Sequence, residues 1–232
     1  VGNTKKMLYH DKGIDMSRWK MLLDSSEQAM NLDTFVTHMK EFRGANRLFI
    51  DCTASETVVD CYRDILQTGI SIVTPNKIAN TKDLASYNRL RELTGKYNAH
   101  FLYETTVGAG LPIINTLQEL IAGGEKILKI EGVLSGTLSY IFNTLAEDTP
   151  LSKAIRQAKE LGYTEPDPRI DLRGMDVARK ILILAREVGA RTELPDIELK
   201  QFIPEDCFRA PSIEAFFESL EKYDIVFHEL VT

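Results

Sequence analysis

A charged segment with two prolines, residues 162–180, holds the side chains whose types and spacing best suit chemistry. Asp176 and Lys180 stand four residues apart, so on a helix they share one face. The loop before that helix carries three further carboxylates, at Glu165, Asp167 and Asp171. Paired carboxylates can hold a substrate ammonium group, and a lysine beside them can polarise a carbonyl oxygen or pass it a proton. The same spacing also occurs in solvated surface pairs, so spacing alone leaves both interpretations open.

The elements around this segment indicate what must position it. Pro166 and Pro168 fix backbone angles and remove amide donors, which favours a rigid loop that holds its side chains in place. A helix is predicted from Met175 to Val188, with Asp176 and Lys180 on the end that receives the loop. We therefore expect a group of carboxylates around one lysine.

The first half of the chain alternates between buried strands and amphipathic helices. This order predicts a parallel sheet with right-handed crossovers and helices on both faces, which is half of a doubly wound, Rossmann-like α/β fold. Ligands of such folds lie at the carboxyl ends of the strands. Strands are expected at residues 47–52, 70–73 and 100–103, and helices at 31–42, at 55–66 and from 82. Ser55 is predicted to be the N-cap of the helix at 55–66. The ligand-facing loops are expected at 51–54, 74–77 and 104–106.

The pattern changes near residue 106, where we place a domain boundary. Residues 1–106 are predicted to form a partial dinucleotide-binding domain, and residues 107–232 an α+β substrate-binding, catalytic and dimerisation domain whose C-terminus we expect to be incomplete. The second domain is predicted to contain an alternating strand, Lys126–Leu134. Its helices are expected at residues 112–122, 138–146, 152–161, 175–188 and 212–230.

The glycine-rich turn of a dinucleotide-binding domain is missing from the expected place. Such a domain should open with a strand, the pattern G-x-G-x-x-G and a helix, because the glycines let the backbone approach the pyrophosphate. The glycines of Val107–Gly110 follow the last predicted strand, so they do not fill that role. Val1–Thr4 is interpreted as the end of a second strand, and we expect the first strand to lie upstream in a longer polypeptide.

Composition excludes several classes of partner. The formal net charge is −6, so there is no basic field to hold a nucleic acid. No apolar run approaches the ~20 residues that span a bilayer, and the N-terminus is not a signal peptide, so we expect no membrane contact and a cytoplasmic protein. Three cysteines without metal-ligand spacing, at Cys52, Cys61 and Cys207, are expected to be reduced thiols.

Four segments carry a resemblance to a known family, and it extends through nearly the whole chain. They are TPNK at residues 74–77, ETTVGAGLP at 104–112, EGVLSGTLSYIFN at 131–143 and ELGYTEPDPRIDLRGMDVARKILILARE at 160–187. In this order they resemble homoserine dehydrogenase, and GMDVARKILILARE is most similar to the dehydrogenase portion of bifunctional aspartate kinase/homoserine dehydrogenase proteins.

The resemblance implies an oxidoreductase that interconverts L-homoserine and L-aspartate 4-semialdehyde by hydride transfer with NAD(P), in the biosynthesis of threonine, methionine and isoleucine. It also implies a homodimer or higher homo-oligomer, and an aspartate kinase domain fused upstream. Whether threonine regulates the protein is left open.

The resemblance also implies roles for individual residues. Lys180 and Lys77 match the two catalytic lysines, and Asp171 matches a third acid of the site. Which lysine transfers the proton is left open. Glu165 and Asp176 match the carboxylates that bind the substrate ammonium.

Cofactor and cation contacts follow from the same resemblance. Thr53 and Ala54 match residues that touch the cofactor, and Gly162 matches a backbone approach to it. Lys77 is also expected to contact the cofactor, because TPNK at residues 74–77 matches the family's loop on the nicotinamide side. A monovalent-cation site, with sodium as the expected ion, is implied for Glu104 and the carbonyls of Val107, Ala109 and Leu111, since such oxygens suit a hard ion.

Cofactor preference is predicted from the residues after the expected second strand. An acid at this point would bind the ribose hydroxyl of NAD, whereas a basic residue favours the phosphate of NADP. Thr4 and Lys5 stand there with no acid beside them, which favours NADP and leaves NAD possible.

Two other functions stay open. Another amino-acid dehydrogenase with the same cofactor fold would differ in its substrate. A catalytically silent fragment, serving only as a structural or dimerisation module, would be consistent with the missing glycine-rich turn.

Overall fold

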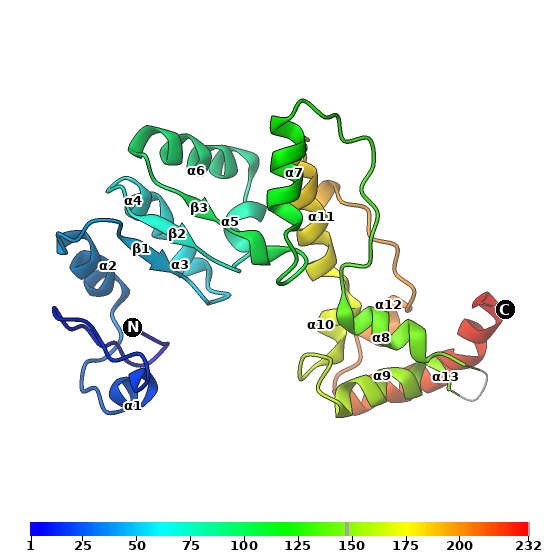
Figure 1. The fold of residues 1–232 in the computed structure, drawn as a ribbon. Helices are drawn as coiled ribbons and strands as arrows, with labels where there is room; N and C mark the ends of the chain where they lie inside the picture. Colours follow the sequence, from blue (N-terminus) through cyan, green and yellow to red (C-terminus); the bar gives the residue numbers. More distant parts are fainter. Residues whose placement is uncertain (147–148, 232) are drawn as a thin grey trace. The chain divides into compact units, whose positions relative to one another are not determined.

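The computed structural model describes the backbone of residues 1–146 and 149–231 and divides the chain into two compact units (Figure 1). The first unit is Val1–Thr106 and the second is Val107–Thr232. Each unit has buried hydrophobic residues of its own. Within the described part of the chain, no helix has the length and apolar character needed to cross a membrane.

The first unit is built on a three-stranded parallel sheet, in the order β1-β2-β3. Parallel strands require crossover connections, and helices supply them here, so the predicted α/β fold with a parallel sheet is confirmed. The strands are β1 (Leu48–Ile50), β2 (Ser71–Val73) and β3 (Phe101–Leu102). The helices are α1 (Trp19–Asp24), α2 (Leu32–Glu41), α3 (Glu56–Asp60), α4 (Tyr62–Leu66), α5 (Ile78–Thr81) and α6 (Leu84–Tyr97), followed by the 3-10 turn η1 (Glu104–Thr106).

One face of this sheet forms the core of the first unit. Phe49 lies opposite Ile72, which lies opposite Phe101, so all three project from the same face, and all are buried. Tyr62 of α4 packs edge-on against Phe49 and Phe101, with ring centroids 6.3 and 5.8 Å apart.

The opposite face of the sheet departs from the prediction that helices cover both faces. Its apolar residues Leu48, Ile50 and Leu102 are exposed. Side chains alternate along a strand, and among the described residues the covered face is the one that carries Phe49. The hydrophobic runs of the strands suggested burial on both faces, but periodicity cannot show which faces have a partner.

The N-terminal residues also differ from their prediction, because Val1–Thr4 does not end a strand of the sheet. The chain folds back on itself: Gly2 forms an antiparallel bridge with Met7, and the backbones of Val1 and Leu8 exchange hydrogen bonds. The side chain of Asn3 accepts from the amides of Lys5 and Lys6, both at 2.8 Å, which stabilises the turn between them.

Several short helices were not predicted or have different bounds. α1 and α5 were missed, because four to six residues show too little periodicity. The helix expected at 55–66 is interrupted at Cys61, and the helix expected from Lys82 begins at Leu84 after the N-cap Asp83. The predicted N-cap at Ser55 is confirmed, since its side chain accepts from the Val58 amide.

The regular secondary structure of the second unit consists of helices in the described residues, with one isolated bridge between Ala146 and Thr149. The predicted long helices are all present within a few residues of their expected bounds. They are α7 (Ile113–Ala122), α8 (Gly136–Thr144), α9 (Leu151–Glu160), α11 (Met175–Glu187) and α13 (Ile213–Val231), joined by α10 (Pro168–Leu172), η2 (Leu194–Asp196) and α12 (Glu205–Phe208).

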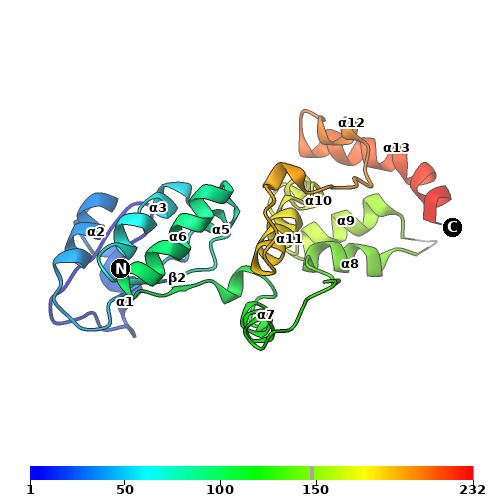
Figure 2. The same ribbon diagram turned by 90° about the horizontal axis from the view of Figure 1, so that it is seen from above.

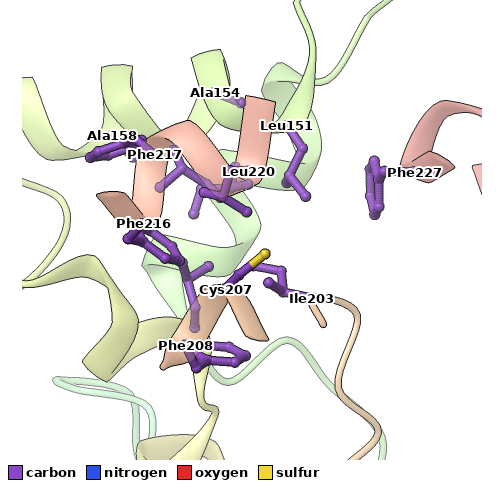
Figure 3. Packing of buried hydrophobic residues seen from close by; sticks show 13 residues of the cluster. Leu151, Ala154, Ala158, Ile203, Cys207, Phe208, Phe216, Phe217, Leu220 and Phe227 are labelled. Carbon is purple, nitrogen blue, oxygen red and sulfur yellow. The ribbon is translucent and has the colours of Figure 1, made fainter. Parts of the chain in front are cut away.

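The core of the second unit lies where α9 packs against α8 and α13, and α12 packs against α13 (Figures 1 and 2). Leu151, Ala154, Ile155 and Ala158 recur at helical spacing, so α9 turns one continuous apolar face inward. Phe216, Phe217 and Leu220 of α13 fill the space opposite, as Figure 3 shows.

The strand predicted at Lys126–Leu134 is absent, although these residues are all described. The segment has no secondary structure, and its side chains Leu128 and Val133 are 86% and 78% exposed. The alternating pattern is a strand pattern, but a strand needs a hydrogen-bonding partner, and none is present in this chain's described residues.

Candidate functional site

The second unit contains a cavity of about 500 Å³ beside α8, α10 and α11. Tyr140 and Tyr163 form part of its wall, with ring centroids 4.8 Å apart and an edge-to-face arrangement. The residues that line it are Ser135, Gly136, Thr137, Tyr140, Tyr163, Asp171, Asp176, Val177 and Lys180. Three of these residues, Asp171, Asp176 and Lys180, were selected from the sequence.

Lys180 and Asp176 share one face of α11, as their spacing predicted. The Lys180 Nζ lies 2.7 Å from the Asp176 Oδ2. It also donates to the Leu134 carbonyl at 2.7 Å, so two of the three ammonium donors have protein acceptors. The Lys180 side chain is only 17% exposed, whereas that of Asp176 is 52% exposed. The lysine is therefore fixed in the wall, and the carboxylate faces solvent in the cavity.

Asp171 lies on the short helix α10 and connects three segments around the cavity. Its Oδ2 accepts from the Glu165 amide at 2.8 Å, and its Oδ1 lies 3.4 Å from the Thr137 hydroxyl. The same hydroxyl lies 2.5 Å from the Tyr163 carbonyl, to which it donates. Thr137 and Asp171 therefore fasten the turn after α9 to the start of α8.

The N-terminus of α8 also faces the cavity, and sequence reasoning did not select it. Ser135 is the N-cap, and its hydroxyl accepts from the Leu138 amide at 3.1 Å. The amides of Gly136 and Thr137 lie in the first turn, where a helix offers no carbonyl partner. A helix start of this kind favours an anion. A serine directly before an apolar, helix-forming run is an N-cap signal, and it was available in the sequence.

Two of the predicted carboxylates are not part of the cavity wall. Glu165 reaches Asp171 through its backbone amide, and its side chain is not among the lining groups. Asp167 caps α10 and binds Arg169, with Nη2 to Oδ2 at 2.7 Å. This bond holds the pKa of Asp167 below its usual value. The group of carboxylates around Lys180 is therefore smaller than expected.

The loop around Asp167 also differs from its prediction, because Pro168–Leu172 is helical. An Asp N-cap followed by proline at the first helical position is a known start signal, since proline has no amide to leave unpaired. We interpreted the two prolines only as loop residues. Tertiary contacts extend the start signal into one helical turn, with the Arg169 Nη1 donating to the Ala210 carbonyl at 2.6 Å.

Gly162 ends α9 with φ at +74°, a conformation that favours glycine. The amide of Tyr163 bonds back to the Ala158 carbonyl, and the Gly162 amide to that of Lys159, which is a common helix end. This geometry alone accounts for the glycine, so its contact with a cofactor stays a prediction.

In the first unit, the loops at the carboxyl ends of β1 and β2 are joined by buried polar groups. Asp51 accepts from the Tyr62 hydroxyl at 2.5 Å and from the Thr53 amide at 2.7 Å. Burial and the adjacent Asp51 raise the pKa of Tyr62, so Tyr62 keeps its proton for donation. Thr53 and Ala54 are exposed above this network, and Lys77 is the N-cap residue of α5.

Two further predicted groups lie in turns. Thr4 and Lys5 are exposed in the N-terminal turn that Asn3 stabilises. The proposed cation ligands follow one another along the chain, from Glu104 in η1 to Leu111 before α7. Within this stretch, Gly108 and Ala109 adopt positive φ values of 78° and 52°, so the backbone winds tightly there.

Within the described residues, no set of three or more His, Cys, Asp or Glu side chains could hold a metal ion, and the three cysteines are free.

Comparison with known proteins matches the two units to two family models. Residues 3–104 match the NAD-binding domain of homoserine dehydrogenase, and residues 112–228 match the model described as homoserine dehydrogenase. Over 226 residues the chain is 47% identical to bifunctional aspartokinase/homoserine dehydrogenase 2 of Arabidopsis thaliana, a chloroplastic protein. The match covers 97% of this chain and 25% of that relative, so the chain spans about a quarter of its length.

Two solved structures share the fold of this chain. A Candida auris protein of unknown function superposes with a TM-score of 0.89 at 36% identity, covering 98% of this chain and 65% of that one. A hyperthermophilic archaeal homoserine dehydrogenase in complex with NADPH superposes with a TM-score of 0.61 at 31% identity, covering 74% of this chain and 52% of that one. From both family models and these likenesses, the chain belongs to the homoserine dehydrogenase family.

Proposed function

We propose that this chain carries out the homoserine dehydrogenase reaction, the interconversion of L-homoserine and L-aspartate 4-semialdehyde with NADP. The observation that carries the proposal is the cavity of the second unit, where Lys180 and Asp176 form an ion pair close to the first turn of α8. A cation, carboxylates and unpaired amides in one cavity suit a small zwitterion that also has a reactive oxygen.

An amino-acid substrate has three polar groups to satisfy, and the cavity offers a partner for each. The substrate carboxylate would accept from the amides of Gly136 and Thr137 at the start of α8. The ammonium group would bind the exposed carboxylate of Asp176. Glu165, whose side chain does not line the cavity, is proposed as a second carboxylate on the family resemblance alone. The oxygen on C4 would approach Lys180, whose third donor remains for it.

The proton step follows from the position of Lys180. Reduction of the aldehyde leaves negative charge on the C4 oxygen, and Lys180 would stabilise that charge and donate the proton. Oxidation of homoserine would run the same transfer in reverse. Asp171 would act by holding the turn after α9 against α8, and Lys77 of the first unit stays a candidate for the second lysine.

The loops of the first unit fit a nicotinamide cofactor. Thr53 and Ala54 are exposed at the carboxyl end of a parallel strand, where such folds bind nucleotides, and the polar groups beneath them are fully engaged. When bound, the nicotinamide supplies or accepts the hydride. Thr4 and Lys5 would select NADP over NAD, because the turn holds a base and no acid. Gly162 would approach the cofactor through its backbone.

A sodium ion is proposed for Glu104 and the carbonyls of Val107, Ala109 and Leu111. The donor set is entirely oxygen, which suits a hard monovalent ion. The winding of the backbone at Gly108 and Ala109 is consistent with carbonyls that turn toward a common point.

We keep the predicted homodimer as a proposal for the assembly. Segment 126–134, with its exposed apolar side chains, would pair with the same segment of a second copy. An upstream aspartate kinase domain is consistent with the Arabidopsis relative, whose name gives both activities. A cytoplasmic location stays a prediction, since that relative is chloroplastic.

The test is an assay of the full-length protein for homoserine-dependent reduction of NADP⁺, followed by nicotinamide absorbance. Other amino acids and simple hydroxy acids serve as controls. We expect reduction of NADP⁺ with homoserine and with none of the control substrates. Equal turnover with another amino acid would reassign the substrate, and no turnover with any of them would overturn the proposed activity.

A further inference from the structure

Asn76 lies in the loop that follows β2 and bonds to the loop that follows β1, and all of its polar side-chain atoms are engaged. It is 3% exposed. Its Nδ2 donates to the Asp51 Oδ2 and to the Ser55 carbonyl, both at 3.2 Å, and its Oδ1 accepts from the Ile78 amide at 3.0 Å. A buried amide with every group paired is held in one orientation.

These contacts fix both ends of a short exposed loop. Asp51 begins the loop and Ser55 ends it, so the single Nδ2 group of Asn76 bridges its start and its finish. Inside the loop, the Thr53 amide donates to the Asp51 Oδ1, and the Ser55 amide donates to the Thr53 hydroxyl at 3.1 Å. Thr53 and Ala54 are therefore presented by a closed set of hydrogen bonds.

The other end of Asn76 fixes the second loop. The Ile78 backbone amide donates to the Asn76 Oδ1, which holds the first turn of α5. The backbone amide of Asn76 itself donates to the Thr74 hydroxyl at 2.9 Å. Thr74 in turn lies 3.0 Å from the Tyr62 hydroxyl, which also donates to Asp51. Lys77 lies within this turn, between Asn76 and Ile78.

We propose that Asn76 is a positioning residue that sets the loop of Thr53 and the loop of Lys77 in a fixed relation through Asp51 and Tyr62. It does not touch the cofactor. It aligns, before binding, the groups that would touch it, and so lowers the ordering cost of binding. The role in cofactor binding rests on the proposed function, whereas the effect on the loops does not.

Three variants separate this role from a general effect on folding. Asn76→Ala removes every side-chain bond. Asn76→Asp keeps the acceptor for Ile78 but places a second carboxyl group beside Asp51. Two carboxylates this close repel each other when both are charged, which favours a state in which one of them is protonated. Asn88→Asp makes the same chemical change on the exposed face of α6 and is the matched control. The titratable groups next to position 76 are Asp51, which Asn76 bonds directly, Tyr62, which bonds the same Asp51 oxygen, and the neighbouring Lys77.

The first readout is the Kd for NADPH of the full-length protein, measured by calorimetry below the unfolding transition. At about pH 8.5 both Asn76 variants should bind at least roughly tenfold more weakly than the unchanged protein. At about pH 6 the Asn76→Asp protein should recover much of its affinity relative to the unchanged protein, because its protonated carboxyl can donate to Asp51 again. Asn76→Ala should not recover, and Asn88→Asp should match the unchanged protein at both pH values.

The second readout needs no cofactor. Hydrogen exchange of the Thr53 and Ser55 amides should accelerate in Asn76→Ala and stay unchanged in Asn88→Asp. If Asn76→Ala does not fold, Tyr62→Phe removes one of the donors to Asp51 and should accelerate exchange at Thr53 to a smaller degree. Three results would overturn the proposal. The first is an NADPH affinity of the Asn76 variants within twofold of the unchanged protein at the higher pH. The others are no recovery of affinity by Asn76→Asp at the lower pH, and unchanged hydrogen exchange in Asn76→Ala. An unchanged protein that binds no NADPH would instead contradict the proposed function, and exchange would still test the role of Asn76 in the loops.

Discussion

Lys180 is held in the cavity wall by Asp176 and the Leu134 carbonyl, which restricts the side chain before any substrate arrives. Replacing Lys180 by alanine should lower kcat roughly 10²- to 10⁴-fold, with a smaller effect on KM, because the proposed proton transfer would contribute only in the transition state. Steady-state kinetics with homoserine would measure this. Lys222→Ala, on the exposed side of α13, is the control and should retain normal kcat.

The alternative at this position is that Lys77 transfers the proton and Lys180 only orients the oxygen. The pH–rate profiles of Lys180→Ala and Lys77→Ala would separate the two, since only loss of the proton donor removes the corresponding limb of the profile. A Lys180→Ala protein with near-normal kcat would contradict the assignment.

Thr137 offers a second prediction for a single residue. Its hydroxyl bonds the Tyr163 carbonyl and approaches Asp171, so Thr137→Val keeps the shape and removes both contacts. The turn after α9 should loosen, and the KM for homoserine should rise about tenfold with kcat less affected. Thr137→Ser keeps the hydroxyl and should restore most of the affinity. If the valine and serine variants have the same KM, the hydroxyl has no role in binding.

Among the elements, α10 depends most on one ion pair. Asp167 caps the helix and binds Arg169, which also reaches the Ala210 carbonyl and so fastens α10 to the segment before α13. Because the pKa of Asp167 is lowered in the folded protein, its contribution to stability is complete above its unfolded-state pKa of about 3.9 and is lost as the pH falls further.

Asp167→Asn should therefore destabilise the protein at neutral pH, and its deficit in unfolding free energy should stay constant from about pH 6 to about pH 4 and shrink as the pH is lowered further toward about 3. Urea unfolding of both proteins across this range would measure the difference. Glu218→Gln, an exposed change on α13, should give a small difference that does not vary with pH. A deficit for Asp167→Asn that stays constant down to pH 3 would show that its charge does not stabilise α10.

At the scale of the whole molecule, the open segment 126–134 is the main departure from the prediction. Leu128 and Val133 are exposed in a stretch without secondary structure, whose backbone is available to pair with another chain. We expect the protein to dimerise through it, and Leu128→Glu with Val133→Glu to yield monomers by light scattering. Ile225→Glu changes an apolar residue on α13 that is also largely exposed, and it should leave the dimer intact. A dimer that persists in the double variant would place the interface elsewhere.

The sequence by itself determined the elements whose signals are local. Helical spacing in α9 and α11, the cap at Ser55 and the alternation of strands and helices all follow from neighbouring residues, because burial of one face imposes a fixed period. The face shared by Asp176 and Lys180 follows from the same period. The family resemblance then indicated roles that spacing alone left undecided.

Only the tertiary structure decided which groups meet. It brought Thr137 and the start of α8 to the cavity of Lys180, and it engaged Asp167 with Arg169 instead. It also joined Asp51, Tyr62 and Asn76, which lie up to 25 residues apart, into one buried network. Residues 126–134 are the opposite case: they have the alternating pattern of a strand, but no other described segment of this chain pairs with them. Periodicity specifies which face an element buries, but not what lies against that face, since that depends on contacts distant in the chain.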